Sequence, residues 1–454
     1  MPTRTAPILN DRPAPAADPL GPIGRLGRFA ATHRAAVFIT WALLAVGLGF
    51  LAPRAETALS GAGWEALGSE SVEARKQVNA SFGGAGAYGL QVAVHSQRLT
   101  AADPRFRRTV AEVERVLASD SAVGRVVPPQ AGVSISRDGR TAVVRATAAE
   151  DPNGMVAAAG HLKEEIAALD APGVEANLTG AAGMWSDFNE ANKEAMLKSE
   201  LFSWPVTLAI LVLAFGSLVA AGLPLLLTIA GLVLSAGVLY LGTMLAPISI
   251  WAMNFALMFA LALGVDYALF VVMRFRNALF GQGLAPPEAV ATTMDTAGKA
   301  VLFSAVTVLI SLAAVMLVPS PAFRSVALGI MISVLFVLAA TLTLLPAVLA
   351  KLGPRVDRLA LPWAHSGEHR SPRFARWGET LWRRPLLFGG LALVALVALA
   401  LPVLGMRTGM PSIKVVPQGD SSRIGYEQVS AAFGPGAPGV LQVTAPQAQA
   451  ADVA

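Results

Sequence analysis

The chain has 454 residues, of which 54% are hydrophobic and 14% are charged, with a formal net charge of +5. A soluble protein carries about 25% charged residues, so this composition is that of a membrane protein. The chain has no cysteine, which excludes disulfides and thiolate metal sites, and its five histidines show no paired-ligand spacing. We therefore expect no metal centre and no bound cofactor.

The N-terminal residues 1–24 are rich in Pro, Ala and Asp without periodicity, which predicts a disordered tail within the segment 1–34. Apolar stretches long enough to span a bilayer follow. There are seven of them, at 35–53, 203–221, 223–245, 250–273, 300–318, 325–350 and 386–406. The sequence therefore predicts an α-helical polytopic membrane protein whose residues 203–350 hold the second to sixth spans.

Lys and Arg gather in the segment before the first span, in the segment after the fourth, and in the linker 351–385. These segments lie on one side of the membrane if every stretch crosses, and the positive-inside rule makes that side the cytoplasm. The N-terminus is then cytoplasmic and residues 54–202 are extracytoplasmic. The positive charge indicates topology, so we expect no nucleic-acid partner.

The extracytoplasmic segment 54–202 has its own pattern of strands and helices. Its predicted order is β-α-β-β-α-β, the split βαβ arrangement of a ferredoxin-like α+β domain. The strands are expected at 90–95, 123–127, 141–145 and 174–178, and the helices at 104–119 and 155–169. A polar helix over 183–202 then leads directly into the second span.

The chain also repeats itself. A shift of 351 residues places Gly68 on Gly419, Phe82-Gly83 on Phe433-Gly434 and Leu90-Gln-Val92 on Leu441-Gln-Val443. The seventh span therefore begins a second copy of the unit that the first span begins. We expect residues 407–454 to be the start of a second, truncated outer domain.

Asp266 lies inside the fourth apolar stretch, 250–273. Twenty-four helical residues cover about 36 Å, and about 12 Å of helix separates Asp266 from Arg274 at the charged end. A carboxylate at that depth costs several kcal/mol to ionise, and intramembrane acids of this kind mark proton or ion relays. The competing interpretation is a protonated Asp that joins helices by hydrogen bonds.

Other polar residues near this position are candidate supports. Tyr267 could donate a hydrogen bond to the ionised carboxylate, or it could be a packing residue. Ser304, Thr307 and Ser311 form one stripe of the fifth span at helical spacing. They could hydrate or hydrogen-bond the relay, or serve helix–helix contact, which small polar residues commonly do in membranes.

Charged residues elsewhere have simpler interpretations. Arg274 and Arg276 follow the fourth span and are interpreted as interfacial residues that contact anionic lipid. Asp187, Glu190 and Glu194 share one helix without a matching His or nucleophile motif. We interpret them as a solvated helical face and expect no enzyme activity.

Several motifs occur together in a fixed order. They are Gly264-Val-Asp-Tyr-Ala-Leu-Phe270, Arg274-Phe-Arg276, Thr296-Ala-Gly-Lys-Ala-Val-Leu-Phe-Ser304 and Thr343-Leu-Leu-Pro-Ala-Val-Leu349. In order and spacing the chain resembles the MMPL family of the resistance-nodulation-division (RND) transporter superfamily, from about residue 25 to the C-terminus. The resemblance implies a bacterial cytoplasmic-membrane exporter driven by protons and built from two repeats, each with an outer porter domain.

The resemblance also implies a site. In the family an Asp-Tyr pair on the fourth span faces an equivalent pair in the second repeat, and the two pairs form the proton relay. Asp266 and Tyr267 match the first pair, whereas the second pair has no counterpart in this sequence.

The resemblance leads to one main hypothesis of function. The chain exports lipids or hydrophobic small molecules with protons as the coupling ion, and it contacts membrane lipids. The alternative is a truncated, non-transporting remnant or an interaction or regulatory module, which needs a homo-oligomer or a partner chain to complete the relay. Another RND branch is disfavoured by the Asp-Tyr pair and the Arg-Phe-Arg motif.

Overall fold

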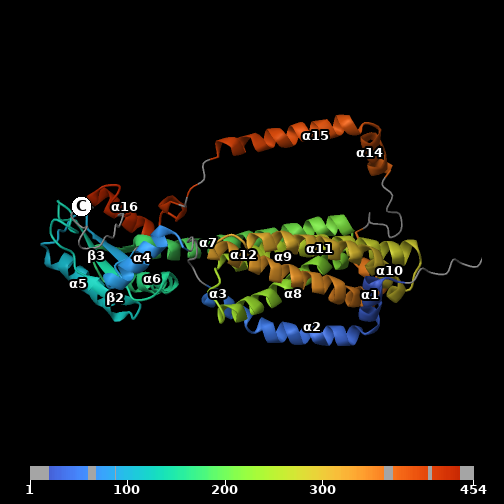
Figure 1. Cartoon of the computed structure of the whole chain (residues 1–454), viewed down its shortest axis with the longest axis horizontal. Coiled ribbons are helices and arrows are strands. Elements are labelled where there is room, and N and C mark those ends of the chain that lie inside the picture. Colours follow the sequence, from blue (N-terminus) through green and yellow to red (C-terminus); the bar gives the residue numbers. More distant parts are fainter. Residues whose placement is uncertain are drawn as a thin grey trace, which may run out of the picture.

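The computed structural model describes residues 20–59, 68–86, 88–361, 372–406, 409 and 412–439. Figure 1 shows a bundle of long helices with a small sheet domain at one end. Seven helices in the described part are long and apolar enough to cross a membrane, as the sequence predicts. The predicted disordered tail lies outside the described residues up to residue 19.

The long helices form the membrane part. They are α2 (Arg34–Gly49), α7 (Gly180–Phe215), α8 (Leu218–Thr243), α9 (Trp251–Arg276), α11 (Lys299–Val315), α12 (Pro321–Ala339) and α15 (Pro385–Ala400). α9 packs extensively on both α8 and α12, and α2 packs on α8. α11 packs mainly against α12. α9 is therefore the central helix of the bundle.

Short helices surround the ends of the spans. They are α1 (Pro22–Thr32), α3 (Ala52–Ala58), α10 (Pro286–Thr293), α13 (Leu345–Leu352) and α14 (Pro372–Arg383), with the short segments η1 (Asn277–Gly281), η2 (Met294–Gly298), η3 (Ala340–Leu344), η4 (Gly353–Asp357), η5 (Leu401–Gly405) and η6 (Ile413–Val415). The prediction of disorder up to residue 24 is wrong at its end, because α1 begins at Pro22. Gly24 and Gly27 are buried against Asp295 and Met294, and this packing orders the helix.

The turn between the second and third spans lies earlier than predicted. We expected the second span to end at residue 221, but α7 ends at Phe215. Gly216 has φ 67°, the left-handed conformation that terminates helices, and the hydroxyl of Ser217 caps α8 at Ala220 N. Because apolar residues lie on both sides of this turn, a hydropathy profile does not locate it.

The sheet domain contains α4 (Glu70–Ser81), β1 (Leu90–His95), α5 (Pro104–Ser119), β2 (Val123–Val127), β3 (Thr141–Ala148), α6 (Pro152–Ala167) and β4 (Glu175–Thr179). The strand order is β2-β3-β1-β4, with antiparallel neighbours throughout. Val92 of β1 pairs with Val144 of β3 and with Leu178 of β4. The predicted positions of all four strands and of both helices are confirmed to within a few residues.

Both faces of this sheet are covered. Alternate residues of β1 point to opposite faces. Val92 and Val94 join a core with Phe106 of α5 and Leu162 of α6. Ala93 packs on the other face with Val143 of β3 and Val429. Val429 belongs to α16 (Ser421–Phe433), which follows the last span.

The helices repeat with the same shift as the sequence. α2 spans 34–49 and α15 spans 385–400, so both bounds differ by 351 residues. α4 and α16 begin at 70 and 421, which differ by the same amount. In the described part, a span and a helix of the outer segment therefore recur in the second copy at the shift seen in the sequence. α15 has no buried residue and stands apart from the bundle in Figure 1. The residues 441–443 that extend the repeat lie outside the described part.

Candidate functional site

A stripe of small residues fixes how α9 sits in the bundle. Its members recur every four residues and are all buried: Ala252, Ala256, Ala260, Gly264 and Ala268. A Cβ at Gly264 would lie 2.5 Å from Thr228 Oγ1 of α8, and a Cβ at Gly329 of α12 would lie 2.4 Å from the Ala252 carbonyl oxygen. Small residues let membrane helices approach this closely. The stripe therefore turns one face of α9 towards α8 and α12.

Asp266 lies on the opposite face of α9. It is two residues from both Gly264 and Ala268, and two helical residues are about 200° apart. Its side chain is accordingly exposed on the surface of the bundle. Within the described part of the chain it has no hydrogen-bond or ion-pair partner.

Tyr267 points into the bundle instead. Its side chain is 5% exposed, and its hydroxyl has no hydrogen-bond partner among the described residues. The structure therefore does not join Tyr267 to Asp266 by a hydrogen bond. A buried donor left unpaired costs about 1–3 kcal/mol. The Tyr267 hydroxyl is thus a hydrogen-bond donor without a described partner, one residue from Asp266 in the sequence.

The candidate supports on α11 are exposed as well. Thr307 donates to the Phe303 carbonyl oxygen at 2.9 Å, and Ser311 donates to the Thr307 carbonyl oxygen at 3.0 Å. Ser304 shares the exposed stripe. The two bonded hydroxyls are satisfied within their own helix, and no described hydrogen bond joins any of the three to Asp266.

Arg276, the last residue of α9, has a buried side chain. The interpretation of Arg276 as an interfacial residue is wrong, because its side chain is 4% exposed. Its Nε lies 2.7 Å from Asp357 Oδ1, and Nη1 donates to the Phe215 carbonyl oxygen at 2.7 Å. The Asp357 contact is an ion pair rather than an aligned hydrogen bond. Burial of an unpaired guanidinium would be costly, so these partners explain its position.

The Arg276 contacts join three helix ends. Phe215 ends α7, Arg276 ends α9, and Asp357 lies in η4 after the sixth span. Ser217 reinforces the junction by donating to the Val356 and Arg358 carbonyl oxygens at 2.9 and 3.0 Å. No local pattern in the sequence predicts this junction, because its partners are far apart along the chain.

A second buried charge lies in the sheet domain. The interpretation of Asp187 as part of a solvated face is wrong, because its side chain is 2% exposed. Lys163 Nζ donates to Asp187 Oδ1 at 2.7 Å and also bonds Glu190. Asp187 Oδ2 accepts from Ser422 N at 2.8 Å, so it caps the start of α16. Glu194 is 67% exposed, as expected.

One helix connects these two buried charges. α7 runs without a break from Gly180 to Phe215, about 54 Å at 1.5 Å per residue. Asp187 lies near its start in the sheet domain, and the Phe215 carbonyl oxygen at its end accepts from Arg276. The sheet domain and the end of the Asp266 helix are therefore linked by a single element.

Comparison with known proteins identifies this arrangement. Residues 64–388 match the MMPL family. The chain belongs to this family. The matched region contains α9 with Asp266 and Tyr267, the whole sheet and six of the seven membrane-length helices in part or in full. The resemblance predicted from the motifs is thus confirmed for the family.

Individual MMPL proteins are similar over most of this chain. It is 30% identical over 429 residues to a mycolic acid-containing lipids exporter, MmpL11, of Mycolicibacterium smegmatis, covering 92% of this chain and 44% of that protein. It is 30% identical over 439 residues to the heme uptake protein MmpL11 of Mycobacterium tuberculosis, at 92% and 44% coverage. The membrane protein YdfJ of Bacillus subtilis is 28% identical over 343 residues, at 75% and 46% coverage. The chain spans less than half the length of these curated relatives.

Proposed function

We propose that this chain takes part in proton-driven export of lipids or hydrophobic small molecules across the cytoplasmic membrane, with Asp266 as the proton carrier. The observation that carries the proposal is the position of Asp266, a lone carboxylate in a membrane-length helix of an MMPL protein. The mycobacterial relative named as a lipid exporter supports lipid cargo. Intramembrane acids of this kind are usually parts of ion pathways.

The proposed chemistry is a change in the protonation of Asp266 that accompanies a change in its surroundings. The protonated form is neutral and tolerates an apolar contact, whereas the ionised form requires water or a donor. Tyr267 has an unused donor and lies about 100° around the helix from Asp266. A shift of α9 that brings this donor towards Asp266 would have to loosen the close packing of the small-residue stripe on α8 and α12. Ser304, Thr307 and Ser311 would offer hydroxyls to water on the exposed surface.

The exposure of Asp266 supports a partner for this surface. An ionisable group in the membrane is stable when protein or a water-filled cavity faces it. We propose that a second unit covers the Asp266 face, either another copy of this chain or a partner half. Two facing carboxylates would titrate as a coupled pair.

The sheet domain is proposed to be the porter domain, on the outer side of the membrane. The strand order β2-β3-β1-β4 and the βαββαβ connections support the proposal of a ferredoxin-like fold for this domain. The basic residues that precede α2 and follow α13 support a cytoplasmic location for the opposite end. Movement of α9 would reach the porter domain through the Arg276 junction and α7.

Cargo transfer in sealed membrane vesicles tests the proposal. Vesicles that contain the chain are given a pH gradient, and transfer of a fluorescent phospholipid across the membrane is followed with and without a protonophore. We expect Asp266→Asn to reduce transfer to the protonophore level. Glu165→Gln, an exposed acid of α6, serves as the matched control and should transfer normally. Gradient-dependent transfer by the Asp266→Asn variant would exclude Asp266 as the carrier.

A second candidate is a module that does not transport by itself. The exposed Asp266 and the unpacked α15 favour it. In that case vesicles with this chain alone show no gradient-dependent transfer, and a partner half restores it. A third outcome concerns the cargo: inward transfer of haem, suggested by the name of the relative from Mycobacterium tuberculosis, would replace lipid export.

A further inference from the structure

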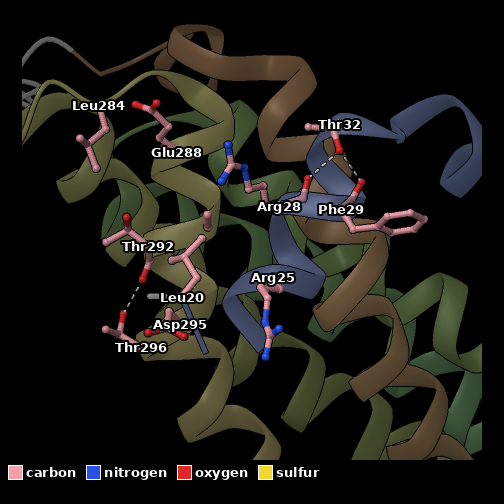
Figure 2. A pocket seen from close by; sticks show the side chains of 11 residues that line it. Leu20, Arg25, Arg28, Phe29, Thr32, Leu284, Glu288, Thr292, Asp295 and Thr296 are labelled. Carbon is pink, nitrogen blue, oxygen red and sulfur yellow. Dashed lines mark hydrogen bonds between the residues drawn. The ribbon is translucent and has the colours of Figure 1, made fainter. Parts of the chain in front are cut away.

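The helices α1 and α10 lie at the end of the bundle away from the sheet (Figure 1). A cavity lies between them (Figure 2). Its volume is about 1280 Å³. Most pockets for small ligands measure about 300–1,000 Å³. The cavity is therefore large enough for more than a small ion.

One face of α1 forms a wall of this cavity. Arg25, Arg28, Phe29 and Thr32 follow the i, i+3, i+4, i+7 spacing of a single helix face, and all four line the cavity. The opposite face, which includes Gly27, is buried. A Cβ at Gly27 would lie 2.4 Å from Met294 Cγ. Tight packing on one side thus leaves the two arginines on the side that lines the cavity, where Figure 2 shows their side chains.

The arginines of this wall are not neutralised by protein. Within the described part of the chain, neither Arg25 nor Arg28 has an ion pair. Asp295 lines the same cavity, but its Oδ1 accepts from Gly21 N at 2.8 Å and pairs with Lys299 Nζ at 3.0 Å. The charge of Asp295 is therefore used to hold the start of α1.

The remaining charges leave a positive excess. Glu288 is the other acid that lines the cavity. Arg274 does not line the cavity itself, but its Nε donates to the lining residue Thr296 at Oγ1, at 3.3 Å. Two lining arginines thus stand against Glu288 as the one lining acid without a described ion pair, and the cavity favours an anion. Each guanidinium group can give a phosphate bidentate hydrogen bonds. In Figure 2 the Arg25 and Arg28 groups point in different directions, so both hold one phosphate only after their side chains turn towards each other.

Apolar groups lie beside these charges. Phe29 is 55% exposed, and Leu20 and Leu284 are half-buried at the edge of the cavity. α1 immediately precedes the membrane helix α2, so this end of α1 meets the membrane surface. A free phosphate would use the arginines alone, whereas a phospholipid would use the arginines and the apolar groups.

We propose that this cavity binds the phosphate headgroup of an anionic phospholipid from the adjacent leaflet. Arg25 and Arg28 hold the phosphate, and Phe29, Leu20 and Leu284 contact the first part of the acyl chains. The site is independent of Asp266 and of the direction of transport. It would anchor α1, and with it α10 and the start of α2, to the membrane surface.

Lipid-dependent thermal stabilisation of the purified full chain in a neutral detergent tests this site. The additives are short-chain phosphatidylglycerol, short-chain phosphatidylcholine and inorganic phosphate, each titrated separately. We expect phosphatidylglycerol to stabilise the chain at the lowest concentration. Each arginine near an anionic surface contributes about fivefold to affinity, so Arg25→Gln with Arg28→Gln should weaken the phosphatidylglycerol effect about 30-fold.

Two further variants separate binding from folding. Arg25→Lys with Arg28→Lys keeps the charges and should retain most of the affinity. Arg107→Gln with Arg108→Gln removes two exposed charges from α5 in the sheet domain and should bind like the native chain. Equal stabilisation by phosphatidylcholine, or unchanged affinity in the double Gln variant at positions 25 and 28, would overturn the proposal. Equal stabilisation by inorganic phosphate would overturn the lipid as the ligand and assign the cavity to soluble phosphate.

Discussion

Two helices of the repeated unit occur in both copies, in different surroundings. In the first copy the span α2 is packed: Trp41 is buried and its indole N–H donates to Thr343 Oγ1 at 3.0 Å. In the second copy the span α15 has no buried residue. The relation is reversed for the helices α4 and α16. α16 packs on the sheet and α7, whereas α4 buries Val72 and Val78 without extensive contact with another described helix or strand.

This difference shows that the burial of each helix depends on the elements that pack against it and not on its own sequence. α2 meets α8 closely, since a Cβ at Gly237 would lie 2.4 Å from the Leu48 carbonyl oxygen. α15 has the same length and a similar apolar composition but meets no equivalent of α8 in the described chain. Substitutions at buried and exposed positions of these helices test what holds each copy in place.

The largest effect is expected for the packed span. Trp41→Ala removes a buried aromatic side chain and its hydrogen bond, and should lower the free energy of unfolding by about 4 kcal/mol. Leu393→Ala, at a 62% exposed position of α15, should change it by less than about 0.5 kcal/mol. Denaturant unfolding in detergent micelles measures both. Equal losses would mean that α15 is as well packed as α2.

The next effect concerns the buried charge that caps α16. Asp187→Asn removes the negative partner of Lys163 and should destabilise the docking of α16 by about 3 kcal/mol. Glu194→Gln, on the same helix but 67% exposed, is the control and should have little effect. Hydrogen exchange of the α16 amides reports docking. Unchanged protection in the Asp187 variant would show that the cap does not hold α16.

A smaller effect is expected from steric change at equivalent positions of α16 and α4. A Cβ at Gly425 would lie 3.0 Å from the Asn177 carbonyl oxygen, so Gly425→Leu should weaken the docking of α16 by about 2 kcal/mol. Ala74 is the equivalent residue of α4, and Ala74→Leu should leave the protection of α4 nearly unchanged. A larger effect at Ala74 than at Gly425 would reverse the proposed difference between the two helices.

The smallest effect is a pH dependence of α16 docking. Burial and the negative charge of Asp187 raise the pKa of Asp420, although Lys163 partly offsets them. An acid whose pKa is raised in the folded state stabilises that state below its unfolded pKa, and this stabilisation is lost as pH rises through the folded pKa. Protection of α16 should therefore increase slightly from pH 7 towards about pH 4. Asp420→Asn should remove this part of the dependence; an unchanged slope would contradict the assignment.

Local patterns predicted much of this fold. Alternation and turn residues predicted the strands of the sheet, and apolar length predicted the spans, because both signals are contained in short windows. The depth of Asp266 followed from its distance to Arg274. Its exposure follows from the small-residue stripe on α9, which the sequence contains but which gains meaning only when α8 and α12 are placed against it.

The features that sequence did not predict depend on distant partners. Arg276 is buried because Asp357 and the Phe215 carbonyl oxygen meet it, and Asp187 is buried because Lys163 and Ser422 meet it. In each case a charged residue near a helix end has the local pattern of a solvated or interfacial group. Only the tertiary arrangement brings in the partner that offsets the free-energy cost of burying the charge.

The most direct test of the proposed account is whether a second unit covers the Asp266 face. Because the chain has no native cysteine, Phe270→Cys places a single thiol one helical turn from Asp266, on an exposed position of α9. Short-range cross-linking in native membranes should give a product of twice the chain mass, whereas Ile310→Cys, exposed on α11, should give little. A monomer alone at position 270, with no cross-linked partner of any size, would contradict the account.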